Sequence, residues 1–361
     1  MMKKEPSRNS SGGARAVKKK VHILVIRLSA MGDVAMTVPV IRTLINTYPQ
    51  LKITVLTRGF FAPMFKDIPN VSVYEADVNG VHSGVIGLGR LAKELRDEEI
   101  DMVADLHDVL RSNVLNSVFY LFGIPVKQID KGRSDKKALT RAEDKVFKQL
   151  KSAHQRYADV FEELGYPISL KDHQFKTKFA LSEEVKAITG DHSKKWLGIA
   201  PFAQHASKSY PSDLMEKVLS ELQQVENVKI FLFGGGAAEL PKLKEWEEQF
   251  SEVKCIAGNF SFEEELALIA NLDAMLSMDS GNGHLAAMDN VPVITIWGLT
   301  HPYAGFVPFN QPPDHSILPD LEKFPLIPTS IYGKKVPEGY ENAMRSIPPQ
   351  AIVEKVLIIL K

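Results

Sequence analysis

Apolar and polar residues alternate along the chain with two different periods. Short runs of consecutive apolar residues indicate strands buried in a parallel sheet, and the segments between them, with an apolar residue every three or four positions, indicate covering helices. In the first half, the pattern predicts strands at 22–28, 52–58, 71–76 and 102–107, and helices at 34–48, 89–99 and 135–165.

The alternation begins again after 167–182, where the periodicity fades. The second half has predicted strands at 196–202, 229–236, 254–258, 274–279 and 292–298, and predicted helices at 211–225, 239–250, 262–272, from 283 onward and at 349–360. We therefore predict an α/β protein of four parts: a disordered basic tail at 1–20, Rossmann-like domains at 21–175 and 176–348, and a closing helix at 349–361.

Two such domains joined end to end leave a crevice between the carboxyl ends of their sheets. Open α/β sheets bind their ligands at these ends. We expect the functional residues in the loops that follow the strands at 22–28, 102–107, 196–202, 229–236 and 274–279.

The loop after the first strand carries a candidate catalytic carboxylate. Gly32 permits a tight turn, and Asp33 follows it at or just before the start of a helix. A carboxylate at the mouth of a cleft can take a proton from an attacking hydroxyl, so Asp33 is a candidate general base. The alternative is that Asp33 only caps the helix.

The loop at 279–284 has the features of a phosphate site. It follows a strand, contains Gly281 and Gly283, and leads into a helix, whose first N–H groups are free to bind a phosphate. Ser280 adds a hydroxyl, and His284 adds a donor or a pyrophosphate contact. The alternative for His284 is a core or capping histidine.

Other loops supply further candidates. Glu239, after the glycines at 234–236, can accept ribose hydroxyls or can simply favour the start of a helix. Lys208 offers a point charge for a pyrophosphate, and Arg111 a guanidinium for an anionic acceptor, although each is alternatively a surface charge. Residues 87–92 match the G-x-G-x-x-A dinucleotide pattern, but a poor strand precedes them, so we interpret this match as fortuitous.

The composition excludes some classes of function. The 361 residues include 44 Lys and Arg and 44 Asp and Glu, so the formal net charge is +0 and general nucleic-acid binding is not expected. One cysteine, Cys255, excludes an intramolecular disulfide and a multi-cysteine zinc site, and fits a reducing cytoplasm. The tail lacks the apolar core of a signal peptide. Its cations suit a solvated tail, with contact to anionic lipid as the alternative.

Three segments together resemble the ADP-heptose:lipopolysaccharide heptosyltransferases of glycosyltransferase family 9. They are IRLSAMGDVAMTVPVIRTL at 26–44, VADLHDVLRSN at 103–113 and MDSGNGHLAAMDNVPVITIWGLTHP at 278–302. The third resembles the family's D-[ST]-G-x-x-H-L-A-A block and the G-x-T-x-P turn after it. The order and spacing of the strands extend the resemblance over 22–361.

The resemblance implies a GT-B architecture, with the acceptor held mainly by the N-terminal domain and the sugar nucleotide by the C-terminal domain. It also implies an inverting displacement without a metal or another cofactor. A heptose or related sugar would move from an ADP-sugar, ADP-heptose in the family, to a lipopolysaccharide-type glycolipid. We expect a cytoplasmic enzyme, with peripheral contact at the inner face of the cytoplasmic membrane as an added hypothesis.

The resemblance assigns a role to each candidate residue. Asp33 falls at the position of the proposed base, and Lys208 at that of a lysine that contacts the donor phosphates. Arg111 falls where a basic residue meets the acceptor. The donor-binding positions are Glu239, Asp279, Ser280, Gly281 and His284.

Other functions remain open at this point. A sugar-nucleotide epimerase or hydrolase would use the same crevice, and so would a non-catalytic nucleotide- or carbohydrate-binding protein. The segment 301–340, rich in proline, matches no pattern of the family, and the cysteines that many members carry are absent from 341–349. The sugar, the accepting hydroxyl and the oligomeric state are therefore not determined by the sequence.

Overall fold

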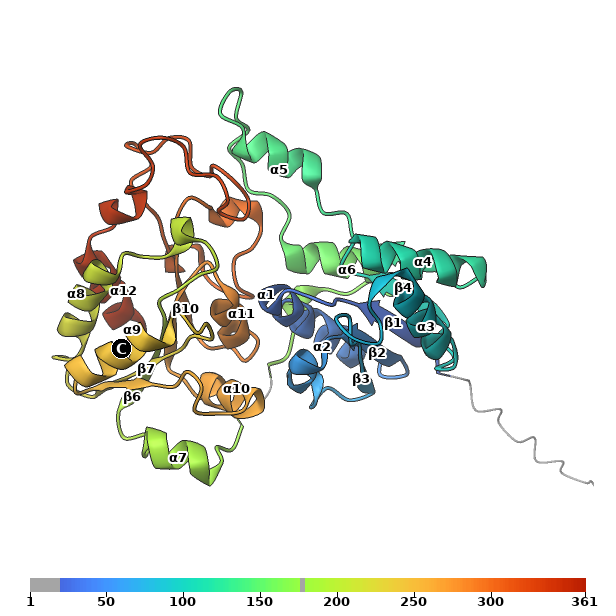
Figure 1. Ribbon diagram of the computed structural model, residues 1–361, viewed down its shortest axis with the longest axis horizontal. Helices are drawn as coiled ribbons and strands as arrows, with labels where there is room; N and C mark the ends of the chain where they lie inside the picture. Colours follow the sequence, from blue (N-terminus) through green and yellow to red (C-terminus); the bar gives the residue numbers. More distant parts are fainter. Residues whose placement is uncertain (1–19, 176–178) are drawn as a thin grey trace, which may run out of the picture.

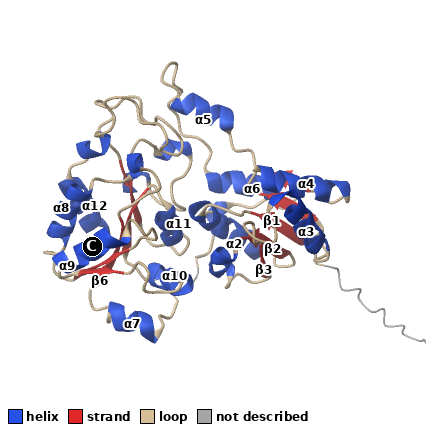
Figure 2. Cartoon of the chain, viewed as in Figure 1, coloured by secondary structure: helices blue, strands red, loops and turns tan. Residues whose placement is uncertain are grey.

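Two α/β units lie side by side in the structure, a computed structural model that describes residues 20–175 and 179–361 (Figure 1). The predicted tail, apart from Lys20, and the predicted boundary at residue 176 lie outside the described residues. Each unit is built around a parallel sheet that is covered by helices (Figure 2).

The first sheet belongs to the N-terminal half and has the strand order β3-β2-β1-β4-β5, with every pair parallel. Its strands are β1 (His22–Ile26), β2 (Lys52–Thr57), β3 (Val71–Glu75), β4 (Met102–Asp105) and β5 (Val126–Gln128). The second sheet has the order β11-β10-β9-β6-β7-β8 and is also parallel. Its strands are β6 (Lys195–Ala200), β7 (Val228–Leu232), β8 (Val253–Cys255), β9 (Ala274–Met278), β10 (Val293–Ile296) and β11 (Ser316–Ile317).

Both sheets have the strand order of the Rossmann fold. Numbered within its own half, the second sheet runs 6-5-4-1-2-3, which is the order 3-2-1-4-5-6 read from the other edge, and the first sheet matches it without a sixth strand. The two domains face each other across a crevice, so the expected GT-B architecture is confirmed.

Helices pack against both faces of the sheets. The N-terminal half contains α1 (Met31–Ala35), α2 (Thr37–Thr47), α3 (Gly84–Arg96), α4 (Leu110–Leu121), α5 (Arg133–Thr140), α6 (Ala153–Glu163), and the 3-10 helices η1 (Gly59–Phe65) and η2 (Leu170–Asp172). The C-terminal half contains α7 (Glu183–Thr189), α8 (Ser212–Leu222), α9 (Leu240–Gln249), α10 (Phe262–Ala270), α11 (Gly281–Ala287), α12 (Pro349–Leu360), and the 3-10 helices η3 (Ala206–Lys208), η4 (Pro302–Ala304), η5 (Pro313–His315) and η6 (Ala343–Ser346). None of the helices in the described residues is long and apolar enough to cross a membrane.

Successive residues of β1 point into two different cores. Ile23 and Val25 pack in a core that includes residues of α2 and α6, whereas Leu24 and Ile26 pack in a core that includes residues of α3 and α4. All four side chains are 0% exposed. Burial on both faces explains why this strand reads as a continuous apolar run.

Most elements lie close to their predicted positions, with some differences. The predicted helix at 135–165 divides into α5 and α6, because the chain between them bonds to the other domain: the N–H groups of Leu150 and Ala153 donate to the carbonyls of Tyr303 (2.9 Å) and Gly305 (2.8 Å). The helices α4 and α7 and the strands β5 and β11 were not predicted. Residues 87–92 lie within α3, so their dinucleotide-like pattern forms no loop.

The starts of two helices also differ from the prediction. Ala30 is the N-cap of α1, so Asp33 is the third residue of this helix and the interpretation of Asp33 as its N-cap is wrong. The Asp33 carboxylate nevertheless accepts a hydrogen bond from the N–H of Ala30 (3.3 Å), which stabilises the first turn. The helix α11 begins at Gly281, two residues before its predicted start, with Ser280 as its N-cap.

The two domains touch most closely where α1 meets α11 (Figure 1). A Cβ atom on Gly32 would lie 2.9 Å from Cδ2 of His284 and 3.3 Å from Cα of Gly281. A Cβ atom on Gly281 would lie 2.5 Å from Cε of Met31. The contact therefore leaves no room for a side chain at Gly32, whereas at Gly281 the flexible end of the Met31 side chain would have to move.

Adding one methyl group at this contact should destabilise the protein. We expect Gly32→Ala to lower the free energy of unfolding by about 1–3 kcal/mol, because the His284 ring or the backbone of α11 must shift to make room. Urea unfolding measures the change.

Gly89→Ala is the matched control, since Gly89 lies in α3 and an added Cβ there would meet no atom within 4 Å. This variant should be neutral or more stable by up to about 1 kcal/mol. Equal stability of the two variants would contradict the close contact of α1 with α11.

Candidate active site

A cleft of about 200 Å³ lies between the domains beside the contact of α1 with α11. Six of the eight residues proposed from the sequence line it: Asp33, Lys208, Asp279, Ser280, Gly281 and His284. The strand orders explain this convergence. They reverse between β1 and β4 and between β6 and β9, and the loops after β1, β6 and β9 carry these six residues.

The Asp33 carboxylate is held by an arginine from the end of β1. Its Oδ2 atom lies 2.8 Å from Nη2 of Arg27. The Nη1 atom of Arg27 donates to the carbonyl of Leu106 (2.6 Å), and its guanidinium lies 5.9 Å from the centre of the Tyr157 ring. The Arg27 side chain is 7% exposed, whereas that of Asp33 is 31% exposed. Arg27 thus orients a carboxylate that is still accessible from the cleft.

Lys208 approaches the same cleft from the C-terminal domain. Its Nζ atom donates to the carbonyl of Asp279 (2.6 Å) and lies 3.2 Å from Oδ2 of that residue. The hydroxyl of Thr300 donates to the same Oδ2 atom (2.8 Å). Asp279 therefore orients the Lys208 ammonium, and its assignment to donor binding stays a prediction.

The start of α11 lies next to this lysine. The first N–H groups of a helix have no acceptor within the helix, and Ser280 at the N-cap adds a hydroxyl, 3.2 Å from that of Ser277. His284 is buried, and burial lowers its pKa below the ordinary value, so its ring is neutral at physiological pH. Its Nδ1 atom is buried and has no hydrogen-bond partner among the described residues.

A second cavity of about 60 Å³ adjoins the cleft, sharing Asp33, Phe306 and Tyr332 with it. Four cationic side chains line this cavity, and apart from Asp33 no acidic residue does so: the cations are Arg27, Lys131, Lys136 and Arg156. We call them the basic cluster. Burial, together with the positive charge of Arg156, lowers the pKa of Lys136 to about 8. Such a cluster is suited to an anionic group.

Two predicted residues lie outside both cavities. Glu239 folds back on its own loop, where its Oε2 atom accepts from the N–H groups of Gly235 (3.0 Å) and Gly236 (3.1 Å). Arg111 is exposed on the first turn of α4. Neither position is in contact with the cleft, and the two assignments stay predictions.

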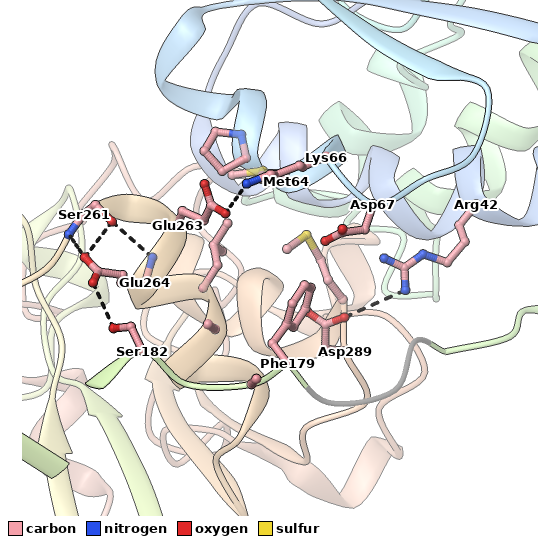
Figure 3. A pocket seen from close by; sticks show the side chains of 15 residues that line it. Arg42, Met64, Lys66, Asp67, Phe179, Ser182, Ser261, Glu263, Glu264 and Asp289 are labelled. Atoms are coloured by element: carbon pink, nitrogen blue, oxygen red, sulfur yellow. Dashed lines mark hydrogen bonds and ion pairs between the residues drawn. The ribbon is translucent and has the colours of Figure 1, made fainter. Parts of the chain in front are cut away.

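A larger cavity of about 450 Å³ lies elsewhere between the domains, between η1 and α10 (Figure 3). Its carboxylates have partners within the protein: Glu263 lies 2.5 Å from Nζ of Lys66, and Glu264 accepts from the hydroxyls of Ser261 and Ser182 (2.8 and 3.0 Å). The elements beside this cavity, η1 and α10, follow β2 and β8, and these strands lie away from the points where the strand orders reverse. We therefore place the candidate active site in the cleft of about 200 Å³ that Asp33 and Lys208 line.

Several residues of the site were not found from the sequence. The basic cluster lies on three segments of the chain, at 27, at 131–136 and at 156, so no single local spacing brings all its members together. The segment 301–340 matched no pattern, yet it supplies Phe306, Ile331 and Tyr332 to the cleft. Arg27 was detectable in principle, because a charged residue at the end of an apolar strand requires a partner.

Comparison with known proteins identifies relatives over most of the chain. The profile of glycosyltransferase family 9 (heptosyltransferase) matches residues 88–315, more than half of the chain. The lipopolysaccharide core heptosyltransferase OpsX of Haemophilus influenzae is 24% identical over 78% of this chain and 80% of its own length. Lipopolysaccharide heptosyltransferase 2 of Escherichia coli is 26% identical over 94% of this chain and 98% of its own length.

Solved structures show the same fold. A family 9 glycosyltransferase from Veillonella parvula superimposes with a TM-score of 0.73 at 18% identity, covering 95% of this chain and 98% of its own. The E. coli heptosyltransferase WaaC, solved with ADP-2-deoxy-2-fluoro heptose, has a TM-score of 0.62 at 19% identity, covering 94% of this chain and 99% of its own. The family match decides between the classes of function that the sequence left open. This chain belongs to glycosyltransferase family 9, the heptosyltransferases, and is a glycosyltransferase of the GT-B fold.

Proposed function

We propose that this enzyme transfers a heptose from ADP-heptose, with inversion at the anomeric carbon, to a hydroxyl of an anionic glycolipid of the lipopolysaccharide-core type. The observation that carries the proposal is that Asp33 of one domain and Lys208 of the other line one cleft. The relatives named as lipopolysaccharide heptosyltransferases, and the E. coli relative solved with ADP-2-deoxy-2-fluoro heptose, support this donor and this class of acceptor.

Asp33 is the proposed general base. The acceptor hydroxyl attacks the anomeric carbon while the bond from that carbon to the diphosphate oxygen breaks. The proton of the hydroxyl passes to the Asp33 carboxylate, and ADP leaves with the electron pair. Arg27, 2.8 Å from Asp33, keeps the carboxylate turned toward the attacking group.

Lys208 is the proposed stabiliser of the departing diphosphate. Negative charge grows on the leaving group, and an ammonium that is already in place stabilises it without reorganisation. The hydroxyl of Ser280 and the first N–H groups of α11 are further donors on the same side of the cleft, and His284 stays our candidate for a pyrophosphate contact. The proposal includes no metal and no organic cofactor, since the chain's own cations offset the diphosphate charge.

The basic cluster is the proposed site for the anionic groups of the acceptor. It adjoins Asp33, so an acceptor bound through phosphate or carboxylate groups would present its hydroxyl to the base. Glu239 stays our candidate for the ribose and Arg111 for an outer contact of the acceptor. We also propose that the enzyme acts in the cytoplasm, at the inner face of the membrane.

Replacing the proposed base should abolish catalysis and preserve binding. We expect Asp33→Asn to lower turnover by roughly 10²–10⁴-fold, which is the usual contribution of general base catalysis, while ADP-heptose still binds. Transfer to the acceptor and calorimetric binding of the donor are measured on the same preparation.

Asp213→Asn is the matched control for this substitution. Asp213 forms an exposed ion pair with Arg345 (2.8 Å) in the C-terminal domain, away from the cleft, so its loss should leave turnover unchanged. An Asp33→Asn enzyme that folds, binds donor and works within a few-fold of the parent would exclude Asp33 as the base.

The proposed acceptor site should be pH-dependent through Lys136. Because the Lys136 ammonium has a pKa of about 8, we expect kcat/KM for the acceptor to fall as the pH rises through that value. A Lys136→Met enzyme should have a lower kcat/KM that lacks this step. Rates at limiting acceptor from pH 6 to pH 10, a range of about two units on either side of the transition, measure it.

The titration of Lys136 also changes the stability of the protein. Stability should rise with pH, whereas kcat/KM for the acceptor should fall. Between about 8 and the ordinary value of 10.5, the unfolded chain holds a proton on Lys136 that the folded chain has lost. Stability therefore rises with pH in this window for the parent relative to Lys136→Met. If neither acceptor kinetics nor relative stability changes through pH 8, the charged cavity assigned to Lys136 is wrong.

A further inference from the structure

Exposed apolar side chains concentrate on one part of the N-terminal domain. Of the fourteen large apolar side chains that are exposed among the described residues, seven belong to α3, α4 and the turns beside them: Val81, Val85, Ile86, Leu110, Tyr120, Leu121 and Phe122. Five of these seven are more than 75% exposed. A concentration of this kind on a folded domain indicates a surface that contacts another apolar phase.

The two helices form one continuous surface. They lie next to each other at the outer end of the domain (Figure 1), and the guanidinium of Arg96 in α3 lies 5.1 Å from the centre of the Phe122 ring after α4. Their inner residues, such as Leu91 and Phe119, pack together in the core on one face of the first sheet. The exposed residues therefore point away from the sheet, and we call this surface the α3/α4 face.

Cations accompany the apolar residues on this face. Arg90 and Lys93 follow Ile86 at four and seven positions along α3, so the three share one side of the helix. Arg111 follows Leu110 at the start of α4. Acidic residues follow the C-terminus of α3, at 97–99. At that end we expect apolar contacts with the bilayer to outweigh electrostatic ones. Apolar side chains flanked by Lys and Arg are characteristic of surfaces that lie in the interface of an anionic bilayer.

The face also continues into the active site. Asp108, two residues before Leu110, pairs with Arg133, and its carbonyl accepts from Nζ of Lys131 (2.9 Å), a member of the basic cluster. The start of α4 therefore borders the cavity that adjoins Asp33. A glycolipid could therefore lie with its lipid part beside α4 and its anionic head group in this cavity.

We propose that the α3/α4 face is a docking surface for an anionic lipid bilayer and that it presents a membrane-anchored acceptor to the basic cluster. The inference rests on the proposed function, because it takes the acceptor to be a glycolipid. Leu121 and Ile86 are the residues inserted among the acyl chains, and Arg90, Lys93 and Arg111 contact the phosphates of the head groups.

Vesicle flotation tests the surface without any substrate. Vesicles of phosphatidylcholine with about 30% phosphatidylglycerol should carry the parent protein, and vesicles of phosphatidylcholine alone should carry less of it. Ile86→Glu combined with Leu121→Glu should weaken binding by at least about tenfold, because two apolar side chains no longer enter the bilayer. The control is Ile358→Glu, which makes the same change on an exposed residue of α12 in the other domain and should bind like the parent.

Further variants separate this proposal from its rivals. Neutralising the cations at Lys3, Lys4, Arg8, Arg15, Lys18 and Lys19 tests the tail instead of the helices. Loss of binding in that variant, with binding retained in the Ile86/Leu121 variant, would overturn the proposal. A parent protein that does not bind vesicles would also overturn it. If the parent is a dimer in solution and the Ile86/Leu121 variant is a monomer that still binds vesicles, the face is instead an interface between copies of this chain.

Activity distinguishes a failure of the docking surface from a failure of the proposed function. The Ile86/Leu121 variant should lose transfer to acceptor embedded in vesicles and keep transfer to acceptor dispersed in detergent, with an unchanged melting temperature. Equal loss with both forms of acceptor would contradict the docking role. If the parent binds vesicles and transfers no sugar to either form, the proposed function fails and the docking surface stands.

Discussion

The close contact of α1 with α11 is the constraint on which the rest of the site depends. Gly32 lies against the His284 ring and Gly281, so two helix starts from different domains meet with the side chains of His284 and Met31 between them. Both helices follow strands at the reversal points of their sheets, where ligands of open α/β sheets bind. Because the contact is this close, Asp33 and Lys208 line one small cleft although 175 positions separate them in the chain.

The charges in the cleft are divided between the domains in a way that suits displacement of a diphosphate. On one side, Arg27 orients the Asp33 carboxylate, and on the other, Asp279 and Thr300 orient the Lys208 ammonium. Each of these two candidate catalytic groups is thus held by a partner of its own domain. A preorganised pair of this kind stabilises charge that develops during the reaction without first having to reorient.

The sequence predicted the fold and the residues that line the cleft from the C-terminal domain better than it predicted the basic cluster. Asp279, Ser280, Gly281 and His284 are adjacent in the chain and follow a strand, so local pattern and family resemblance both identify them. The basic cluster comes from positions 27 to 156, and only the packing of α5 and α6 brings its residues together. Tertiary contacts also explain the missed break between α5 and α6, where Leu150 bonds to the segment 301–340 through Tyr303.

The helix α4 was also missed, for a reason that lies in its own sequence. Its exposed residues Leu110, Tyr120 and Leu121 interrupt the helical period of its buried ones, Leu115 and Phe119, so no clear amphipathic pattern was visible. A surface that contacts a second phase weakens the signal from which helices are predicted. The features that sequence reasoning missed thus depend on contacts between segments that are far apart in the chain, or belong to a helix without a clear amphipathic pattern.

A crystal structure of the enzyme with ADP-heptose tests the central claim most directly. The account predicts the diphosphate within hydrogen-bonding distance of Lys208 Nζ and Ser280 Oγ, with the anomeric carbon facing the Asp33 carboxylate. A diphosphate bound instead in the cavity of about 450 Å³ beside Arg42 and Lys66, with the cleft at Asp33 empty, would contradict it.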